Sequence, residues 1–354
     1  MCAQTSNSTN KSIEEIQINS KERKQNGEFV RGVSGFRNIL EKNSIFEPEP
    51  KRYHLLVALN CPWCHRVTLA RNILGLQNSI TMDIVFPNRT SADHPNGSNQ
   101  WEFAPERKAS LTNTQLSECT LDTATGHNFR VVRQIYQAEG SQEGSLPILY
   151  DKKTNRIVSN ESAEIVRMLN KNALSLGSNL DDKERLDLYP KTKQSEIDLL
   201  NEQIYVNINN GAYKAGFSSN QSIYKQAYEN YFDTLNLLEK RLASNNHSFL
   251  TGNRFTEADL RLFPTLYRHD PVYYLRMKLN GAKILDYPHL WNWLCRVYAL
   301  PGVATSNSLV HCRQGYFGRS WNNVVPLGPI KPMPYPEAYK HPELADLNKN
   351  QTNS

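Results

Sequence analysis

The sequence Cys-Pro-Trp-Cys, which begins at Cys61, constrains the fold of this chain more than any other feature. Residues 53–58 before it form a short apolar run that is typical of a buried strand, and residues 65–76 after it carry apolar side chains at helical spacing. Cys61 should therefore lie where a helix begins, and the partial positive charge of free backbone N–H groups there favours a thiolate. We predict that Cys61 is a nucleophile with a lowered pKa.

Cys64 lies three residues further along, within one helical turn of Cys61. It can resolve a mixed disulfide formed on Cys61, or it can be a small buried apolar side chain. His65 and Arg66 follow, and we expect them to add positive potential near the thiol. A Cys-x-x-Cys pair next to a strand–helix–strand pattern indicates redox chemistry.

The alternatives to redox chemistry are a zinc site and two inert, buried cysteines. Zinc needs four ligands, and a second close pair of Cys or His is expected. The remaining cysteines are far apart in the sequence and do not supply that pair: Cys119, Cys295 and Cys312. We therefore expect no metal, and six cysteines in 354 residues do not make a disulfide scaffold.

The first half of the chain, residues 51–171, alternates between strand and helix patterns. Strands are predicted at residues 53–58, 80–86, 146–150 and 156–158, and helices at residues 65–76, 129–137 and 161–170. A polar, loop-rich stretch covers residues 88–127. The order strand, helix, strand, loop, helix, strand, strand, helix indicates a single α/β domain.

The pattern changes after a polar linker at residues 172–183. No strand pattern follows, and residues 184–325 are predicted to form an all-helical domain because apolar side chains recur at helical spacing. The recurring groups are Ile197, Leu200 and Ile204; Tyr228, Phe232, Leu235, Leu238 and Leu242; Leu260, Phe263 and Leu266; and Leu290, Trp293, Leu294 and Val297. The acidic segment 256–259 is interpreted as a capping box, Thr-x-x-Asp, that serves folding rather than chemistry.

The two ends of the chain differ from these domains. Residues 1–27 are polar and are predicted to be disordered. Residues 28–50 contain four spaced apolar side chains and are predicted to be an extension that packs on the main body. The Pro-rich stretch that opens residues 326–354 predicts an extended C-terminal tail.

Charge and hydropathy exclude several classes of function. The net charge of +6 is spread along the chain without a dense Lys/Arg run, which disfavours nucleic-acid binding. No segment approaches the ~20 apolar residues of a membrane span. The polar N-terminus lacks the features of a secretory or transit peptide, so we expect a cytosolic protein.

The order of motifs resembles that of the glutathionyl-hydroquinone reductases, or Xi-class glutathione transferases, and of their fungal omega-like members. The resemblance covers roughly residues 27–330. The motifs that carry it are Phe29, Arg31, Phe36 and Arg37, then residues 60–66, 101–103, 146–151, 160–170, 206–217, 255–263 and 324–329.

The resemblance implies a thioredoxin-like N-terminal domain, a helical C-terminal domain and a homodimer. It also implies glutathione as co-substrate. In such enzymes the first cysteine, here Cys61, attacks the sulfur of a glutathionyl-hydroquinone, and a second glutathione resolves the resulting mixed disulfide. Omega-like members also carry out thiol transfer and dehydroascorbate reduction.

The same resemblance suggests a glutathione site. Pro147 matches a cis-proline that, with Leu146 before it, presents backbone to the cysteinyl part of glutathione. Glu161 and Ser162 match the pair that holds the γ-glutamyl end; the alternative for Ser162 is an ordinary helix N-cap, and both roles can coexist. Trp101 matches a tryptophan that lies over glutathione; the alternative is a tryptophan that only packs at the surface.

The resemblance also suggests an electrophile site and shows three departures. Tyr213 and Tyr316 match tyrosines near the electrophile, although a lone tyrosine is more often structural. The family usually has alanine where this chain has Cys64, an arginine shortly before the cis-proline where it has residues 142–145, and a histidine where it has Gly315. Two alternatives therefore stay open: a dithiol oxidoreductase that uses Cys61 and Cys64, and a non-catalytic binding module.

Overall fold

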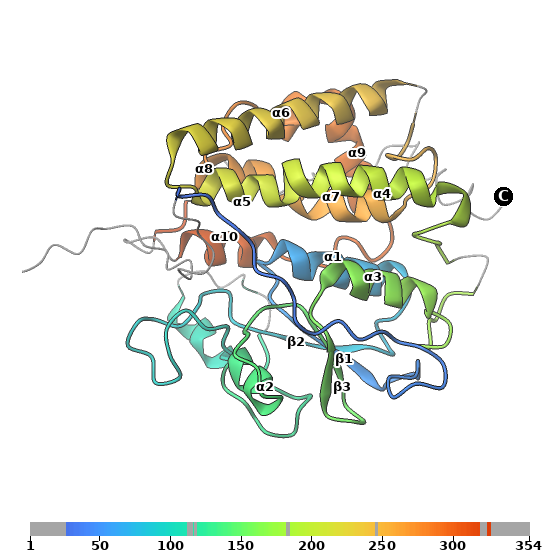
Figure 1. The fold of residues 1–354 in the computed structure, drawn as a ribbon, viewed down its shortest axis with the longest axis vertical. Coiled ribbons are helices and arrows are strands. Elements are labelled where there is room, and N and C mark those ends of the chain that lie inside the picture. The colour runs from blue at the N-terminus through green and yellow to red at the C-terminus, as the bar shows by residue number, and fades with distance from the viewer. Residues whose placement is uncertain are drawn as a thin grey trace, which may run out of the picture.

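The computed structural model describes residues 26–111, 116, 119–181, 185–244, 247–318 and 324–326. Figure 1 shows an α/β layer below a layer of helices. The predicted tails, residues 1–27 and 326–354, lie almost entirely outside the described residues.

A four-stranded mixed sheet forms the centre of the α/β layer. Its strands are β1 (Tyr53–Val57), β2 (Thr81–Ile84), β3 (Ile148–Asp151) and β4 (Arg156–Ser159), in the spatial order β2-β1-β3-β4. β1 pairs parallel with β2, and β3 pairs antiparallel with both β1 and β4. All five side chains of β1 are buried, which explains its continuous apolar sequence.

Three helices complete this layer: α1 (Pro62–Ile73), α2 (Val132–Ala138) and α3 (Ser162–Lys171). The parallel pair β1–β2 requires a crossover connection, which α1 provides. α1 and α3 lie against each other between the sheet and the helical layer, and α2 lies away from that layer (Figure 1). The predicted element order and the thioredoxin-like fold class are confirmed.

The second layer is entirely helical where it is described. Its helices are α4 (Gln194–Gln203), α5 (Asn210–Phe217), α6 (Gln221–Ala243), α7 (Glu257–Arg268), α8 (Tyr274–Arg276), α9 (Pro288–Ala299) and α10 (Leu309–Phe317). π-helical segments join α4 to α5 (Ile204–Asn209) and α7 to α8 (His269–Tyr273). The four predicted periodic groups fall on α4, α6, α7 and α9, except that Ile204 is the first residue of the π-helical segment after α4.

The predicted capping box at the start of α7 is confirmed. The Asp259 carboxylate accepts from the Thr256 N–H at 3.0 Å and from the Thr256 hydroxyl at 3.3 Å. The Asp259 carboxylate also accepts hydrogen bonds from the Leu250 N–H and from the Trp293 indole, both at 2.8–2.9 Å. Asp259 therefore connects α7 to α9 and to the turn before α7, which is the folding role that the sequence predicted.

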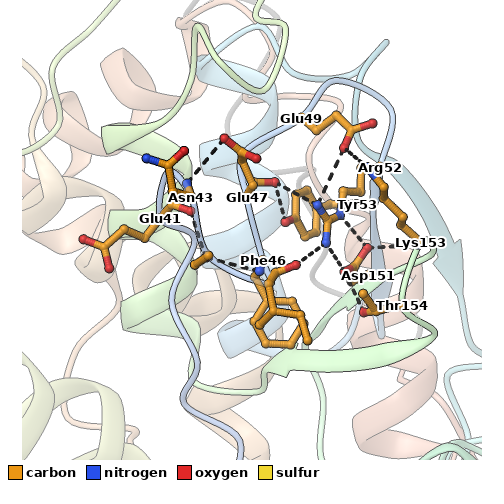
Figure 2. Close-up of polar contacts among 12 residues, drawn as sticks. Glu41, Asn43, Phe46, Glu47, Glu49, Arg52, Tyr53, Asp151, Lys153 and Thr154 are labelled. Carbon is orange, nitrogen blue, oxygen red and sulfur yellow. Dashed lines mark hydrogen bonds and ion pairs between the residues drawn. The ribbon is translucent and has the colours of Figure 1, made fainter.

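The buried Arg52, which forms an ion pair with Asp151 on β3, ties the N-terminal extension to the sheet, as Figure 2 shows. The Arg52 guanidinium binds the Asp151 carboxylate at 2.6 and 2.8 Å and also donates to the Glu47 carbonyl oxygen. Lys153 adds an ion pair with Glu49 at 2.8 Å. Three apolar side chains of the extension are buried: Phe29, Leu40 and Phe46.

The segment predicted as a linker, residues 172–183, packs closely where it is described. Ala173 and Leu176 are buried, and the Ser178 hydroxyl donates to the Leu74 carbonyl oxygen at 2.7 Å. Among the described residues, no helix has the length and apolar character needed to cross a membrane.

Candidate active site

A cleft of about 1170 Å³ opens between the Cys61 end of the sheet and the helical layer. The predicted site residues come together there even though more than 250 positions separate the first from the last. Those that line the cleft are Cys61, Trp101, Leu146, Pro147, Glu161, Ser162, Tyr213 and Tyr316. Cys64 does not line it, because its side chain is fully buried behind Cys61.

Cys61 is the N-cap residue of α1, as the sequence predicted. Proline follows as the first helical residue, a position that suits its fixed φ angle and its missing N–H. Burial opposes ionisation of Cys61, but hydrogen bonds from the Cys64 thiol and from the backbone N–H groups of Cys64 and Trp63 outweigh it. Together with the Arg268 charge they lower the pKa of Cys61 to about 6.

Cys64 has the opposite electrostatic character. Burial raises its pKa well above the usual value, and the neighbouring Cys61 thiolate raises it further. The Cys64 sulfur accepts a hydrogen bond from the Ala58 N–H at 3.3 Å, which holds it against the end of β1. At neutral pH the pair is thus a Cys61 thiolate that accepts a hydrogen bond from a Cys64 thiol.

The prediction that His65 supplies positive charge is wrong. Burial and the neighbouring Arg268 lower the pKa of His65 well below its usual value, so the ring is neutral at physiological pH. The buried Arg66 donates to Asn209, the last residue of the π-helical segment before α5, and its guanidinium lies 4.5 Å from the centroid of the Trp63 ring. Both side chains leave the first turn of α1 on the face that meets the helical layer.

Arg268, which sequence reasoning missed, supplies the charge instead. It is the last residue of α7 and is fully buried. No local pattern marks it, because only the packing of α7 on α1 brings it near the motif.

The predicted glutathione residues occupy one wall of the cleft. The Leu146–Pro147 peptide bond is cis, as the resemblance implies, and the Leu146 carbonyl oxygen lies 3.9 Å from the Cys61 sulfur. The alternative interpretation of Ser162 as an N-cap is wrong, because the cap of α3 is Glu161, whose carboxylate accepts from the Ala163 N–H at 3.1 Å. Ser162 is instead the first residue of the helix and is buried.

Trp101 packs against its surroundings and also lines the cleft, and its placement over glutathione stays a prediction. Its side chain is 7% exposed, and the Arg89 guanidinium lies 3.4 Å from the centroid of its ring. Residues 142–145 contribute no cation before the cis-proline. Arg133 on α2 nevertheless lines the cleft next to Gly144, and its Nε is buried without a hydrogen-bond partner among the described residues.

The two predicted tyrosines belong to a group of three. The Tyr213 and Tyr316 hydroxyls lie 2.6 Å apart, and the Tyr273 hydroxyl is 3.2 Å from that of Tyr316. Burial raises the pKa of all three, so each keeps its phenolic proton at neutral pH. Arg31 of the extension lies 4.8 Å from the Tyr213 ring centroid and also lines the cleft. Neither Tyr273 nor a role for Arg31 in the cleft was predicted.

In the part of the chain that the structure describes, no group of three or more His, Cys, Asp or Glu residues could hold a metal ion.

Comparisons with known proteins agree with this arrangement. Residues 60–172 match the model of the glutathione S-transferase N-terminal domain, and residues 221–296 match that of the C-terminal domain. The glutathionyl-hydroquinone reductase YqjG of Escherichia coli is 38% identical over 87% of this chain and 90% of its own length. Glutathione S-transferase omega-like 2 of Schizosaccharomyces pombe is 35% identical over 89% of this chain and 96% of its own.

Solved structures show the same similarity. The glutathione-S-transferase Xi from Phanerochaete chrysosporium has a TM-score of 0.77 and 36% identity, with 88% of this chain and 95% of that one covered. The glutathione-bound structure of YqjG from Escherichia coli has a TM-score of 0.72 and 36% identity, with 84% and 93% covered.

Proposed function

This chain belongs to the glutathione transferase family that contains the Xi-class enzymes and the glutathionyl-hydroquinone reductases, and we propose that it reduces glutathionylated substrates through Cys61. The observation that carries this proposal is the Cys61 thiol, whose pKa is lowered to about 6 and which lies in the cleft beside the Leu146 carbonyl. A thiolate present at neutral pH is the attacking form of a cysteine.

The proposed first step is attack of the Cys61 thiolate on the sulfur of a glutathionyl-hydroquinone. A Cys61–glutathione disulfide forms, the bond from sulfur to the ring carbon breaks, and that carbon takes up a proton to give the hydroquinone. In the second step a glutathione thiolate attacks the glutathione sulfur of the mixed disulfide. Oxidised glutathione leaves, and the Cys61 thiolate is restored.

The cleft offers groups suited to each part of glutathione. The start of α3, with Glu161 and Ser162, suits the γ-glutamyl group, because helix N-termini bind carboxylates and Glu161 can accept from the ammonium. The backbone at Leu146 and Pro147 suits the cysteinyl part beside Cys61. These assignments follow the family, as does the placement of Trp101 over glutathione.

Arg133 suits the glycyl carboxylate. It lines the same cleft from α2, an element other than the α3 start that is assigned to the γ-glutamyl end. A guanidinium with a buried, unbonded Nε gains a charge-assisted hydrogen bond when a carboxylate arrives. Arg133 would thereby replace the arginine that the family carries before the cis-proline.

The three tyrosines suit the electrophile. Because Tyr213 and Tyr316 stay protonated at neutral pH, either can donate a hydrogen bond to a quinol oxygen. A charge that develops on that oxygen during attack would be stabilised by such a donor.

Mass spectrometry of the intact protein tests the proposal. We expect reduced enzyme incubated with glutathionyl-menadiol to gain one glutathione and release menadiol, and Cys61→Ser to do neither. Cys64→Ala is the matched control, since it removes the neighbouring sulfur and leaves the nucleophile. Absence of both adduct and menadiol from the wild type would refute hydroquinone reduction.

The mixed disulfide can also be resolved by a second route. The Cys64 thiol favours this route because it donates a hydrogen bond to Cys61 and so lies beside the sulfur that it would attack. In this route Cys64 attacks the Cys61 sulfur of the mixed disulfide, its proton passes to the departing glutathione, and a Cys61–Cys64 disulfide forms. An internal disulfide that depends on both cysteines, two mass units below the reduced protein, would identify this route. Its absence during turnover would leave the direct route.

Assembly and location follow the family as well. We propose that the chain forms a homodimer and acts in the cytosol. Exposed apolar side chains such as Leu199 and Val206 are available for burial in a dimer interface. Light scattering after size-exclusion chromatography measures the assembly, and a monomeric mass at micromolar concentration would contradict the dimer.

A further inference from the structure

Arg268 reaches from the helical layer into the loop that carries the nucleophile. Its Nη2 donates to the carbonyl oxygens of Leu59 at 3.0 Å and Cys61 at 3.5 Å, and its Nε donates to that of Asn60 at 3.3 Å. Its Nη1 lies 2.9 Å from Nδ1 of the neutral His65 ring. One guanidinium thus contacts three consecutive carbonyls between β1 and α1, which its fixed fork of five donors allows.

Other parts of the helical layer hold the same loop less extensively. The Asn307 side-chain amide donates to the Leu59 carbonyl oxygen at 2.6 Å, and the Cys312 thiol lies 3.5 Å from it. These contacts reach one carbonyl only, so Arg268 is the group that spans the loop as far as Cys61.

Arg268 also differs in charge from the titratable groups that face Cys61. Burial raises the pKa of Cys64 on α1, of Tyr213 on α5 and of Cys312 on α10, so all three are neutral at pH 6. Arg268 on α7 stays cationic, and its charge favours the Cys61 thiolate. Further charged groups line the cleft: Arg31, Arg89, Arg133, Glu143, Glu161 and Arg276.

From these contacts we propose that Arg268 is a positioning residue for the nucleophile: it holds the loop from Leu59 to Cys61 and places a positive charge near the thiolate. This inference rests on the proposed function only in taking Cys61 as the nucleophile. It gives the helical domain a part in activating the thiol, in addition to any part in choosing the substrate.

Alkylation of Cys61 by iodoacetamide between pH 4.5 and 9, read by mass spectrometry of its peptide, tests the charge. In Arg268→Gln we expect the pKa of Cys61 to rise by about one unit, which lowers the alkylation rate about fivefold at pH 6 and leaves it unchanged at pH 9. A merely structural loss would lower the rate equally at both pH values. An unshifted pKa in folded Arg268→Gln would overturn the proposal.

Arg52→Met is the matched control. Arg52 is also a buried arginine, but it precedes β1 and pairs with Asp151, at the opposite end of that strand from Cys61. We expect its variant to lose stability and to keep the wild-type pKa of Cys61. A similar pKa shift in both variants would show that the shift comes from general destabilisation, and this would also overturn the proposal.

Arg268→Lys separates position from charge and remains decisive if Arg268→Gln does not fold. An ammonium keeps the charge but cannot span three carbonyls, so we expect kcat to fall about tenfold while KM for glutathione is unchanged. Unaltered kcat in this variant would overturn the positioning role. A failure of this inference can be told apart from a failure of the proposed function. The pKa of Cys61 is obtained from its alkylation by iodoacetamide, which needs no glutathionylated substrate.

Discussion

The contact between the two cysteines leads to a quantitative prediction for Cys64→Ala. The substitution removes one sulfur from a fully buried position and takes away the thiol that donates to the Cys61 thiolate. It leaves the backbone N–H groups at the start of α1 and the charge of Arg268 in place. The change therefore isolates one contribution to the acidity of Cys61.

The size of the effect follows from the strength of that hydrogen bond. Hydrogen bonds to charged groups contribute about 1.5–3 kcal/mol, and a thiol is a weak donor, so the lower end applies. One pKa unit corresponds to about 1.4 kcal/mol, so the pKa of Cys61 should rise by about one unit. From the starting value of about 6, the thiolate fraction at pH 6 then falls from about half to about a tenth.

The assay is the pH dependence of kcat/KM with glutathionyl-menadiol, alongside alkylation of Cys61. Since raising the pKa removes thiolate only below the new value, the variant should be about fivefold slower at pH 6 and equal to the wild type above pH 8.5. A pH profile identical to that of the wild type would refute the claim that the Cys64 thiol stabilises the thiolate. Loss of all activity at pH 8.5 would instead make Cys64 an obligatory resolving residue.

Three further predictions concern separate parts of the molecule. Arg133→Ala should raise KM for glutathione about tenfold. KM for γ-glutamylcysteine, which lacks the glycyl carboxylate, should stay unchanged, and equal effects on both would contradict binding of that carboxylate by Arg133. Tyr316→Phe should lower kcat with a glutathionyl-hydroquinone about tenfold but not with an alkyl glutathione disulfide, which has no quinol oxygen; equal losses on both substrates would exclude the hydrogen bond. Asp259→Ala should lower the free energy of unfolding by roughly 2–4 kcal/mol, measured in urea, because the buried Leu250 and Trp293 N–H groups lose their acceptor; a loss below roughly 1 kcal/mol would contradict that role.

Local physics explains why much of the site could be predicted from the sequence. A cysteine that follows an apolar strand and precedes a proline-initiated helix must lie at that helix N-terminus, so the part of the pKa shift of Cys61 that comes from Trp63 and Cys64 follows from adjacent residues. In the same way, apolar side chains at helical spacing predicted the helices α4, α6, α7 and α9. α5 and α10 were not predicted as separate helices; α10 buries polar residues such as His311 and Gln314 on its packed face, so its pattern is weak.

The errors arise where a side chain depends on a distant partner. We expected a positive charge on His65 because the usual pKa of histidine lies near neutral pH. Burial and the neighbouring Arg268 lower that pKa, so the ring is neutral. Ser162 looked like a helix cap, yet the backbone turns one residue earlier and Glu161 takes that place.

The sequence by itself determined the position of Cys61 at a helix N-terminus, the order of strands and helices, and the change to an all-helical second half, because each depends on spacing between near neighbours. Only the tertiary structure decided that Arg268 lies near Cys61, that Arg133 lines the same cleft, and that Tyr273 joins Tyr213 and Tyr316. Arg268 joins α7 to the loop after β1, and the tyrosines join α5 and the segment His269–Tyr273 to α10, across many intervening residues. Such contacts arise from the packing of whole elements, which residue spacing along the chain does not encode.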